Sequence, residues 1–73
     1  MELKAKNYFR SKKELSKEAI SLALGGNWER AAEVNQAILD QTPDDVESMN
    51  RLGKALMEVG EYGGARDVLV RVV

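Results

Sequence analysis

Neither cysteine nor histidine occurs anywhere in the 73 residues of this chain. Without cysteine the chain has no disulfide framework, no thiol nucleophile and no cysteine-ligated zinc site. Without histidine it lacks the usual proton shuttle at neutral pH and the commonest metal ligand. Because these absences exclude most catalytic constellations, we predict neither enzymatic activity nor a bound cofactor or metal.

Long apolar runs are also missing. No stretch approaches the roughly 20 apolar residues of a membrane-spanning helix, and the N-terminus lacks the apolar core of a secretory signal. Proline occurs once, whereas Ala, Leu, Glu and Lys are common, and this composition favours helix. We therefore expect an all-α, soluble, cytoplasmic protein.

The chain matches itself at an offset of thirty-four residues. Each matched position keeps the size class of its side chain. The pairs are Leu15 and Met49, Ala19 and Gly53, Leu22 and Leu56, Gly26 and Gly60, Trp28 and Tyr62, Ala31 and Ala65, Val34 and Val68, and Ile38 and Val72. Such regular self-similarity is typical of a repeat protein.

The matched residues are spaced by three and four, as on one face of a helix, and glycines interrupt the spacing in both copies. Each copy therefore reads as a helical hairpin, with helices expected at 12–24, 28–41, 45–59 and 61–73. Capping signals stand before three of these helices: Ser11 with Glu14, Asn27, and the pair Asp44 and Asp45. Adjacent aspartates at a helix start are far more often caps than a catalytic acid and base, which would need a cleft and raised pKa values.

A helix-turn-helix unit of this length, with these small and aromatic positions, resembles the tetratricopeptide repeat. The segment "NRLGKALMEVGEYGGA" (50–65) is the closest match, and the first copy departs from the pattern at Glu18, Ala19 and Asn35. The signature residues are Ala19, Trp28, Ala31, Pro43, Gly53, Tyr62 and Ala65.

The resemblance implies two antiparallel helical hairpins of a right-handed α-solenoid. Residues 1–11 would form a basic N-terminal arm or a helix extension, 12–45 the first repeat, and 46–73 an incomplete second repeat without a capping helix. A glycine within a helix costs ~1 kcal/mol relative to alanine. We therefore expect Gly53 to allow close approach to Ala65, as Ala19 does to Ala31. Trp28 and Tyr62 would wedge between the hairpins.

Members of this family bind extended peptides or partner helices in a concave groove lined by the first helix of each hairpin. The resemblance therefore implies a protein-interaction scaffold whose partner the sequence does not identify. The groove residues carried over are Lys13, Ser16, Ile20, Ala23, Glu47, Asn50, Lys54 and Met57. They have no single charge sign. Only Asn50 and Arg51 match fragments of the clamp with which some relatives grip chaperone carboxylates, so that ligand is not expected.

An alternative function rests on the basic arm "KAKNYFRSKK", where Tyr8 and Phe9 would stack on bases among phosphate-binding cations. The competing interpretation is that the arm prolongs the first helix, because Tyr8 lies seven residues before Leu15 on the same stripe. Since charge runs are usually solvated faces, nucleic-acid binding is the less favoured function.

The last stretch, "DVLVRVV", is strongly apolar. Either the chain is part of a longer repeat array, or copies of it self-associate as a homo-oligomer through Val68, Leu69, Val72 and Val73. Gly63 and Gly64 would weaken the last helix and provide a hinge for exchange of a hairpin.

Overall fold

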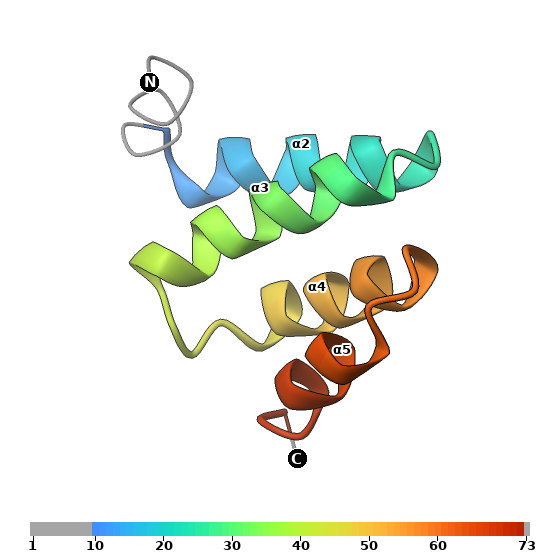
Figure 1. The fold of residues 1–73 in the computed structure, drawn as a ribbon. Helices are drawn as coiled ribbons and strands as arrows, with labels where there is room; N and C mark the ends of the chain where they lie inside the picture. Colours follow the sequence, from blue (N-terminus) through green and yellow to red (C-terminus); the bar gives the residue numbers. More distant parts are fainter. Residues whose placement is uncertain (1–9, 73) are drawn as a thin grey trace.

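The structure is a computed structural model that describes residues 10–72, and within that range it contains four α-helices and no strand. They are α2 (Lys12–Leu24), α3 (Trp28–Gln41), α4 (Val46–Glu58) and α5 (Tyr62–Leu69). Helices α2 and α3 form one antiparallel pair and α4 and α5 a second, stacked beside it (Figure 1). The all-helical prediction is confirmed, and the first two helices have the expected limits.

Side chains cap two of the helices as predicted. The backbone N–H of Glu14 donates to Ser11 Oγ at 3.1 Å, and the Ser11 N–H donates back to Glu14 Oε1 at 3.1 Å. Asp45 accepts from the Ser48 N–H at 3.0 Å. Asn27 stands at the N-cap of α3, as its place before Trp28 predicts, but its side chain makes no capping bond. Its ψ of 72° departs from the extended backbone of Ser11, at 158°, which aims a capping side chain at the helix.

The two hairpins turn in the same way. Gly26 and Gly60 have φ values of 77° and 87°, in the left-handed region that favours glycine. In both turns the next N–H reaches back to close the helix, from Asn27 to the Leu22 carbonyl and from Glu61 to the Leu56 carbonyl, each at 2.8 Å. The sequence repeat is therefore also a repeat of backbone geometry at the turns.

The core consists of two apolar clusters joined through α3. Leu15 and Ala19 of α2 pack with Val34 and Ile38 of α3. The second cluster brings together side chains of α3, α4 and α5, namely Leu39, Met49, Leu52 and Val68. Because α3 contributes to both clusters, the two hairpins are packed into one unit.

Leu69 is the side chain nearest to Gly53. A β-carbon on Gly53 would lie 2.5 Å from Leu69 Cδ2 and 2.6 Å from Leu69 Cγ. The expected close approach of α4 and α5 is therefore present at Gly53, and the side chain nearest to it is a leucine one helical turn beyond Ala65. Ala65 is itself buried, at 1% exposure.

Two further expectations for the second hairpin are wrong. Tyr62 is 66% exposed instead of wedged between hairpins, whereas its counterpart Trp28 is half-buried. The last helix ends at Leu69 instead of continuing to 73. After Leu69 the chain continues as tight turns. In these turns the Arg71 N–H donates to the Val68 carbonyl and the Val72 N–H to the Leu69 carbonyl, each at 3.1 Å. The valines of this stretch are β-branched and have low helix propensity.

Candidate functional site

The eight groove positions predicted from the sequence all remain unburied on α2 and α4. Lys13, Ile20, Glu47, Asn50, Lys54 and Met57 are exposed, and Ser16 and Ala23 are half-buried. The positions at intervening helical spacing, such as Leu15 and Met49, fill the core. The predicted residues are therefore available at the surface of two successive hairpins.

Large apolar side chains stand among these positions. Ile20 is 45% exposed on α2 and Met57 is 48% exposed on α4. Leu24, which the resemblance did not select, is 85% exposed one turn beyond Ile20. The spacing of four between Ile20 and Leu24 is the signal that could have identified it. The fold itself makes little use of these three side chains.

Arg51 links α4 to both helices of the first hairpin. Its Nε donates to Asn35 Oδ1 at 2.9 Å, and its Nη2 lies 3.3 Å from Ser16 Oγ and 3.2 Å from Ser48 Oγ. Asn35 is 1% exposed and donates to the Ala31 carbonyl at 3.0 Å. One predicted groove residue, Ser16, is thus engaged in a polar contact between hairpins.

Asn35 has a role that the sequence did not reveal. The tetratricopeptide pattern that the sequence resembles usually has a bulky residue there, and the asparagine departs from it. The sequence offers one signal for this role: an amide side chain directly after Val34, within an apolar stripe. That signal does not identify Arg51, sixteen residues away in α4, as the partner. Together with Arg51 and Ser48 it forms a polar contact that satisfies its own buried amide.

Asp45 completes this polar cluster at the start of α4. Its carboxylate accepts hydrogen bonds from the Ser48 N–H and hydroxyl and pairs with Lys12 of α2. The bonds from Lys12 first, and from Ser48 second, lower the pKa of Asp45 to about 2, against a smaller opposing effect of burial. A lowered pKa suits a permanently charged cap and is the opposite of what a general acid needs.

Lys54 of α4 contacts an aromatic ring of the first hairpin and a carboxylate of its own helix. Its Nζ lies 5.8 Å from the centroid of the Trp28 ring, within range of a cation–π contact, and 3.1 Å from Glu58 Oε2. The Trp28 ring of the first hairpin therefore lies close to a cation of the second.

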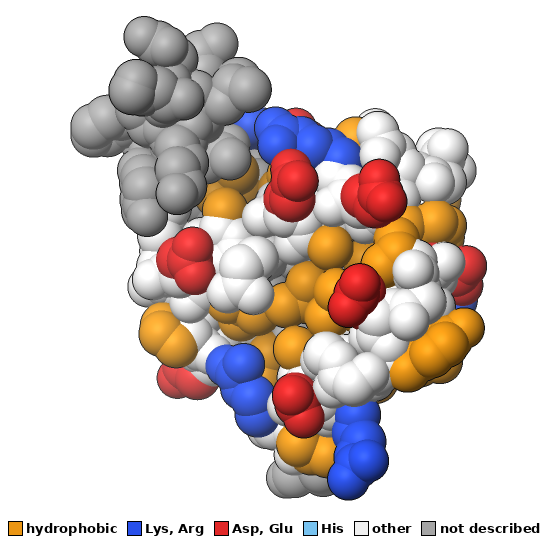
Figure 2. Space-filling view, viewed as in Figure 1, with side chains coloured by type: hydrophobic (Ala, Val, Ile, Leu, Met, Phe, Trp, Pro, Cys, Tyr) orange, Lys and Arg blue, Asp and Glu red, His pale blue; other side chains and the backbone are white. Residues whose placement is uncertain are grey.

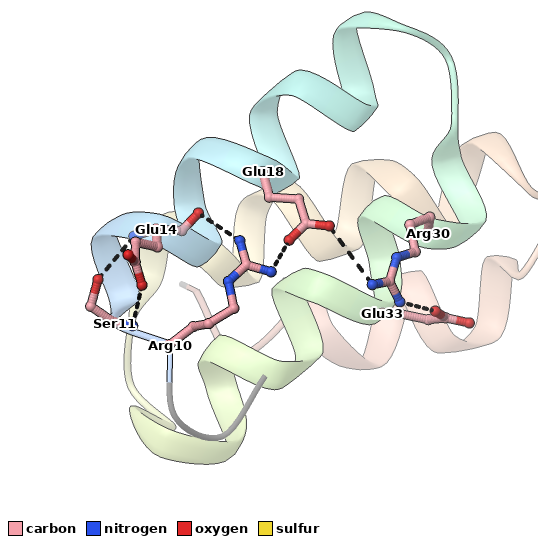
Figure 3. Close-up of polar contacts among 6 residues, drawn as sticks. All are labelled: Arg10, Ser11, Glu14, Glu18, Arg30 and Glu33. Atoms are coloured by element: carbon pink, nitrogen blue, oxygen red, sulfur yellow. Dashed lines mark hydrogen bonds and ion pairs between the residues drawn. The ribbon is translucent and has the colours of Figure 1, made fainter. Parts of the chain in front are cut away.

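A cluster of alternating charges joins α2 to α3 (Figure 3). Glu18 pairs with Arg10 and lies 3.7 Å from Arg30, which in turn binds Glu33 at 3.0 Å. Glu18 is a departure from the pattern that the sequence resembles, and this cluster pairs its carboxylate with two arginines.

The basic arm is described only at its end. Residues 1–9, with Tyr8 and Phe9, lie outside the described residues. Arg10 and Lys12, two of the arm's cations, are engaged with Glu18 and Asp45. Of the remaining described cations of the arm, Lys13 is exposed.

The apolar C-terminal residues pack largely within the chain. Val68 is 9% exposed and belongs to the second core cluster, against which Val72 also packs. Leu69 covers Gly53. Val73 lies outside the described residues, and Val70, at 59% exposure, is the valine of this stretch that faces solvent.

Residues 10–72 contain neither a candidate metal site nor a candidate membrane-spanning helix. No group of three or more acidic, cysteine or histidine side chains is placed to hold a metal ion in that range. None of its helices has the length and apolar character needed to cross a membrane.

No protein-family model, curated protein or solved structure matches this chain.

Proposed function

We propose that this chain is a tetratricopeptide-like, two-hairpin module that binds a peptide or a partner helix on the face formed by α2 and α4. One observation carries the proposal: residues at equivalent positions of the two hairpins stay at the surface, and Ile20 and Met57 are large apolar side chains among them, at 45% and 48% exposure. Side chains that the core does not use favour a surface for a partner.

The polar cluster around Arg51 would contribute to such binding by fixing the two helices relative to each other. Ser16 and Arg51 hold α2 to α4 at 3.3 Å, so the face would be largely formed before a partner arrives. A preformed surface loses less conformational entropy on binding. A helix or extended peptide with apolar anchors, flanked by polar groups for Asn50 and Lys54, is the ligand class that fits.

A selection from a displayed peptide library tests this function. We expect the selected peptides to lose most of their affinity for the double variant Ile20→Ser, Met57→Ser, and part of it for Asn50→Ala and Lys54→Ala. Glu33→Gln, at an exposed position of α3, is the matched control and should bind as the unchanged chain does. Selected peptides that bind all variants equally would contradict the proposal.

Self-association through the C-terminal stretch is a separate proposal. Of the four residues predicted for it, Val68, Leu69 and Val72 contribute to packing within the chain, and Val73 lies outside the described residues. Val70, at 59% exposure, is an added candidate. Sedimentation over a range of concentrations tests it, and a folded monomer at every concentration would remove it.

A further inference from the structure

On the other side of the molecule, a seam runs between α3 and α5. Both helices pack on α4. Figure 2 shows this side: apolar side chains are visible along a strip between the two helices, acidic side chains stand on both sides of the strip, and most Lys and Arg side chains lie toward the upper and lower margins. We define the α3–α5 seam by Ala32, Leu56 and Gly64.

Glycine keeps the seam open. Ala32 and Leu56 are half-buried against the second core cluster. A β-carbon on Gly64 would lie 3.6 Å from Leu56 Cδ1, at ordinary contact distance. Any side chain at position 64 would therefore cover Leu56, and glycine leaves it reachable. Position 64 has no positive φ that requires glycine, so the helix keeps this residue at a cost of roughly 0.5–1 kcal/mol relative to alanine.

Carboxylates without partners flank the seam. Glu29 lies three residues before Ala32 on α3, and Asp67 lies three residues after Gly64 on α5. Glu61, the N-cap residue of α5, lies three residues before Gly64. Since residues three apart are neighbours on a helix surface, each carboxylate lies next to a residue of the seam. None of the three carboxylate groups has a hydrogen-bond or ion-pair partner within residues 10–72. Glu33 and Glu58, by contrast, are paired with Arg30 and Lys54.

We propose that the α3–α5 seam binds a cationic amphipathic helix from a partner protein, with an apolar ridge over Leu56 and Ala32 and Lys or Arg beside Glu29, Glu61 and Asp67. A helix laid between two helices fits ridges into the groove between them, and unpaired carboxylates on both walls favour a partner with cations on both flanks. This site is distinct from the α2–α4 face, and it does not depend on the function proposed there.

Fluorescence anisotropy with a synthetic Leu/Lys amphipathic helix tests the proposal, with a Leu/Glu peptide of the same pattern as the control probe. We expect the Leu/Lys probe to bind and the Leu/Glu probe not to bind. Gly64→Leu, which fills the seam, should weaken binding about tenfold. Glu29→Gln and Asp67→Asn should each weaken it roughly two- to fivefold at low salt and reduce its salt dependence.

The chain offers matched controls. Gly63→Ala should stabilise the same helix but leave the seam open, because nothing lies within 4 Å of a β-carbon there. Glu47→Gln removes an exposed carboxylate from α4, and Ile20→Ser with Met57→Ser alters the α2–α4 face. All three should bind the probe as the unchanged chain does, and thermal unfolding verifies that Gly64→Leu is folded.

Equal binding by Gly64→Leu and the unchanged chain would overturn the proposal, as would loss of binding in the Ile20→Ser, Met57→Ser variant. A third outcome would also overturn the proposal: Gly64→Leu changes the sedimentation of the chain but not its affinity for the probe. The seam would then be occupied by a second copy of the chain.

Discussion

Gly53 and Gly64 both lie within helices, yet their surroundings differ. A β-carbon at Gly53 would enter the space of Leu69, at 2.5 Å, whereas one at Gly64 would make an ordinary contact with Leu56, at 3.6 Å. Both glycines lower helix propensity to a similar extent. Only the one at position 53 is required by the packing of α5 on α4.

We expect Gly53→Ala to destabilise the chain by about 1 kcal/mol, because overpacking costs about 1–3 kcal/mol and the gain in helix propensity offsets about 1 kcal/mol of it. Urea unfolding measures the change. Gly64→Ala is the control and should stabilise by roughly 0.5–1 kcal/mol. In a Leu69→Ala background, Gly53→Ala should no longer destabilise; an unchanged cost there would show that Leu69 is not the cause.

Asp45 makes the stability depend on pH. Its pKa is lowered from 3.8 to about 2 in the folded chain, so its contribution is fully present above 3.8 and is lost as the pH falls from 3.8 through about 2. We expect Asp45→Asn to flatten the loss of stability in this window, measured by urea unfolding at a series of pH values. Asp44→Asn, at an exposed neighbour, is the control; an equal effect of both variants would contradict the assignment to Asp45.

At the scale of elements, α3 connects the molecule. Its Val34 and Ile38 face α2, its Leu39 faces α4 and α5, and its Asn35 binds Arg51 of α4. The polar contact is directional, whereas apolar packing is not. It therefore fixes how α4 lies against the first hairpin more narrowly than the apolar clusters alone would.

Asn35→Leu should destabilise the chain by about 1–3 kcal/mol, although it restores the bulky residue typical of such repeats, because the half-buried Arg51 Nε loses its acceptor. The double variant Asn35→Leu, Arg51→Leu should recover much of the loss, since it removes both partners. A double-mutant cycle by urea unfolding measures the coupling. Additive losses would show that the two residues are not coupled.

At the scale of the whole molecule, the C-terminal valines divide into two groups. Val68 closes the second core cluster and is 9% exposed, whereas Val70 is 59% exposed. A small domain has only a few kcal/mol of net stability, so the inward group supports the fold of the single chain. Among the C-terminal valines up to residue 72, Val70 is the one exposed enough to contact another copy.

Val68→Asp should therefore unfold the chain, because it buries an unpaired charge in the core. Val70→Asp should change the free energy of unfolding by no more than about 0.5 kcal/mol. Circular dichroism and thermal unfolding distinguish the two, and sedimentation of Val70→Asp shows any effect on association. Comparable destabilisation by both variants would contradict this division.

Much of the fold follows from the sequence because its causes are local. The caps at Ser11 and Asp45, the left-handed glycines at 26 and 60 and the apolar stripes depend on residues three or four positions apart. The eight groove positions, which were carried over from the resemblance, all lie outside the buried core, six of them exposed and two half-buried. The peptide-library experiment tests whether these positions act together as a binding face.

What the tertiary structure alone decided are the contacts between residues far apart in sequence. The helix crossing places Leu69 nearest to Gly53, leaves Tyr62 in solvent and brings Arg51 to Asn35 and Ser16. Local sequence signals are enough to place the starts of the helices, the hairpin turns and the buried face of each helix. They did not determine these contacts, because the angle at which two helices pack depends on the combined shape of all the side chains between them.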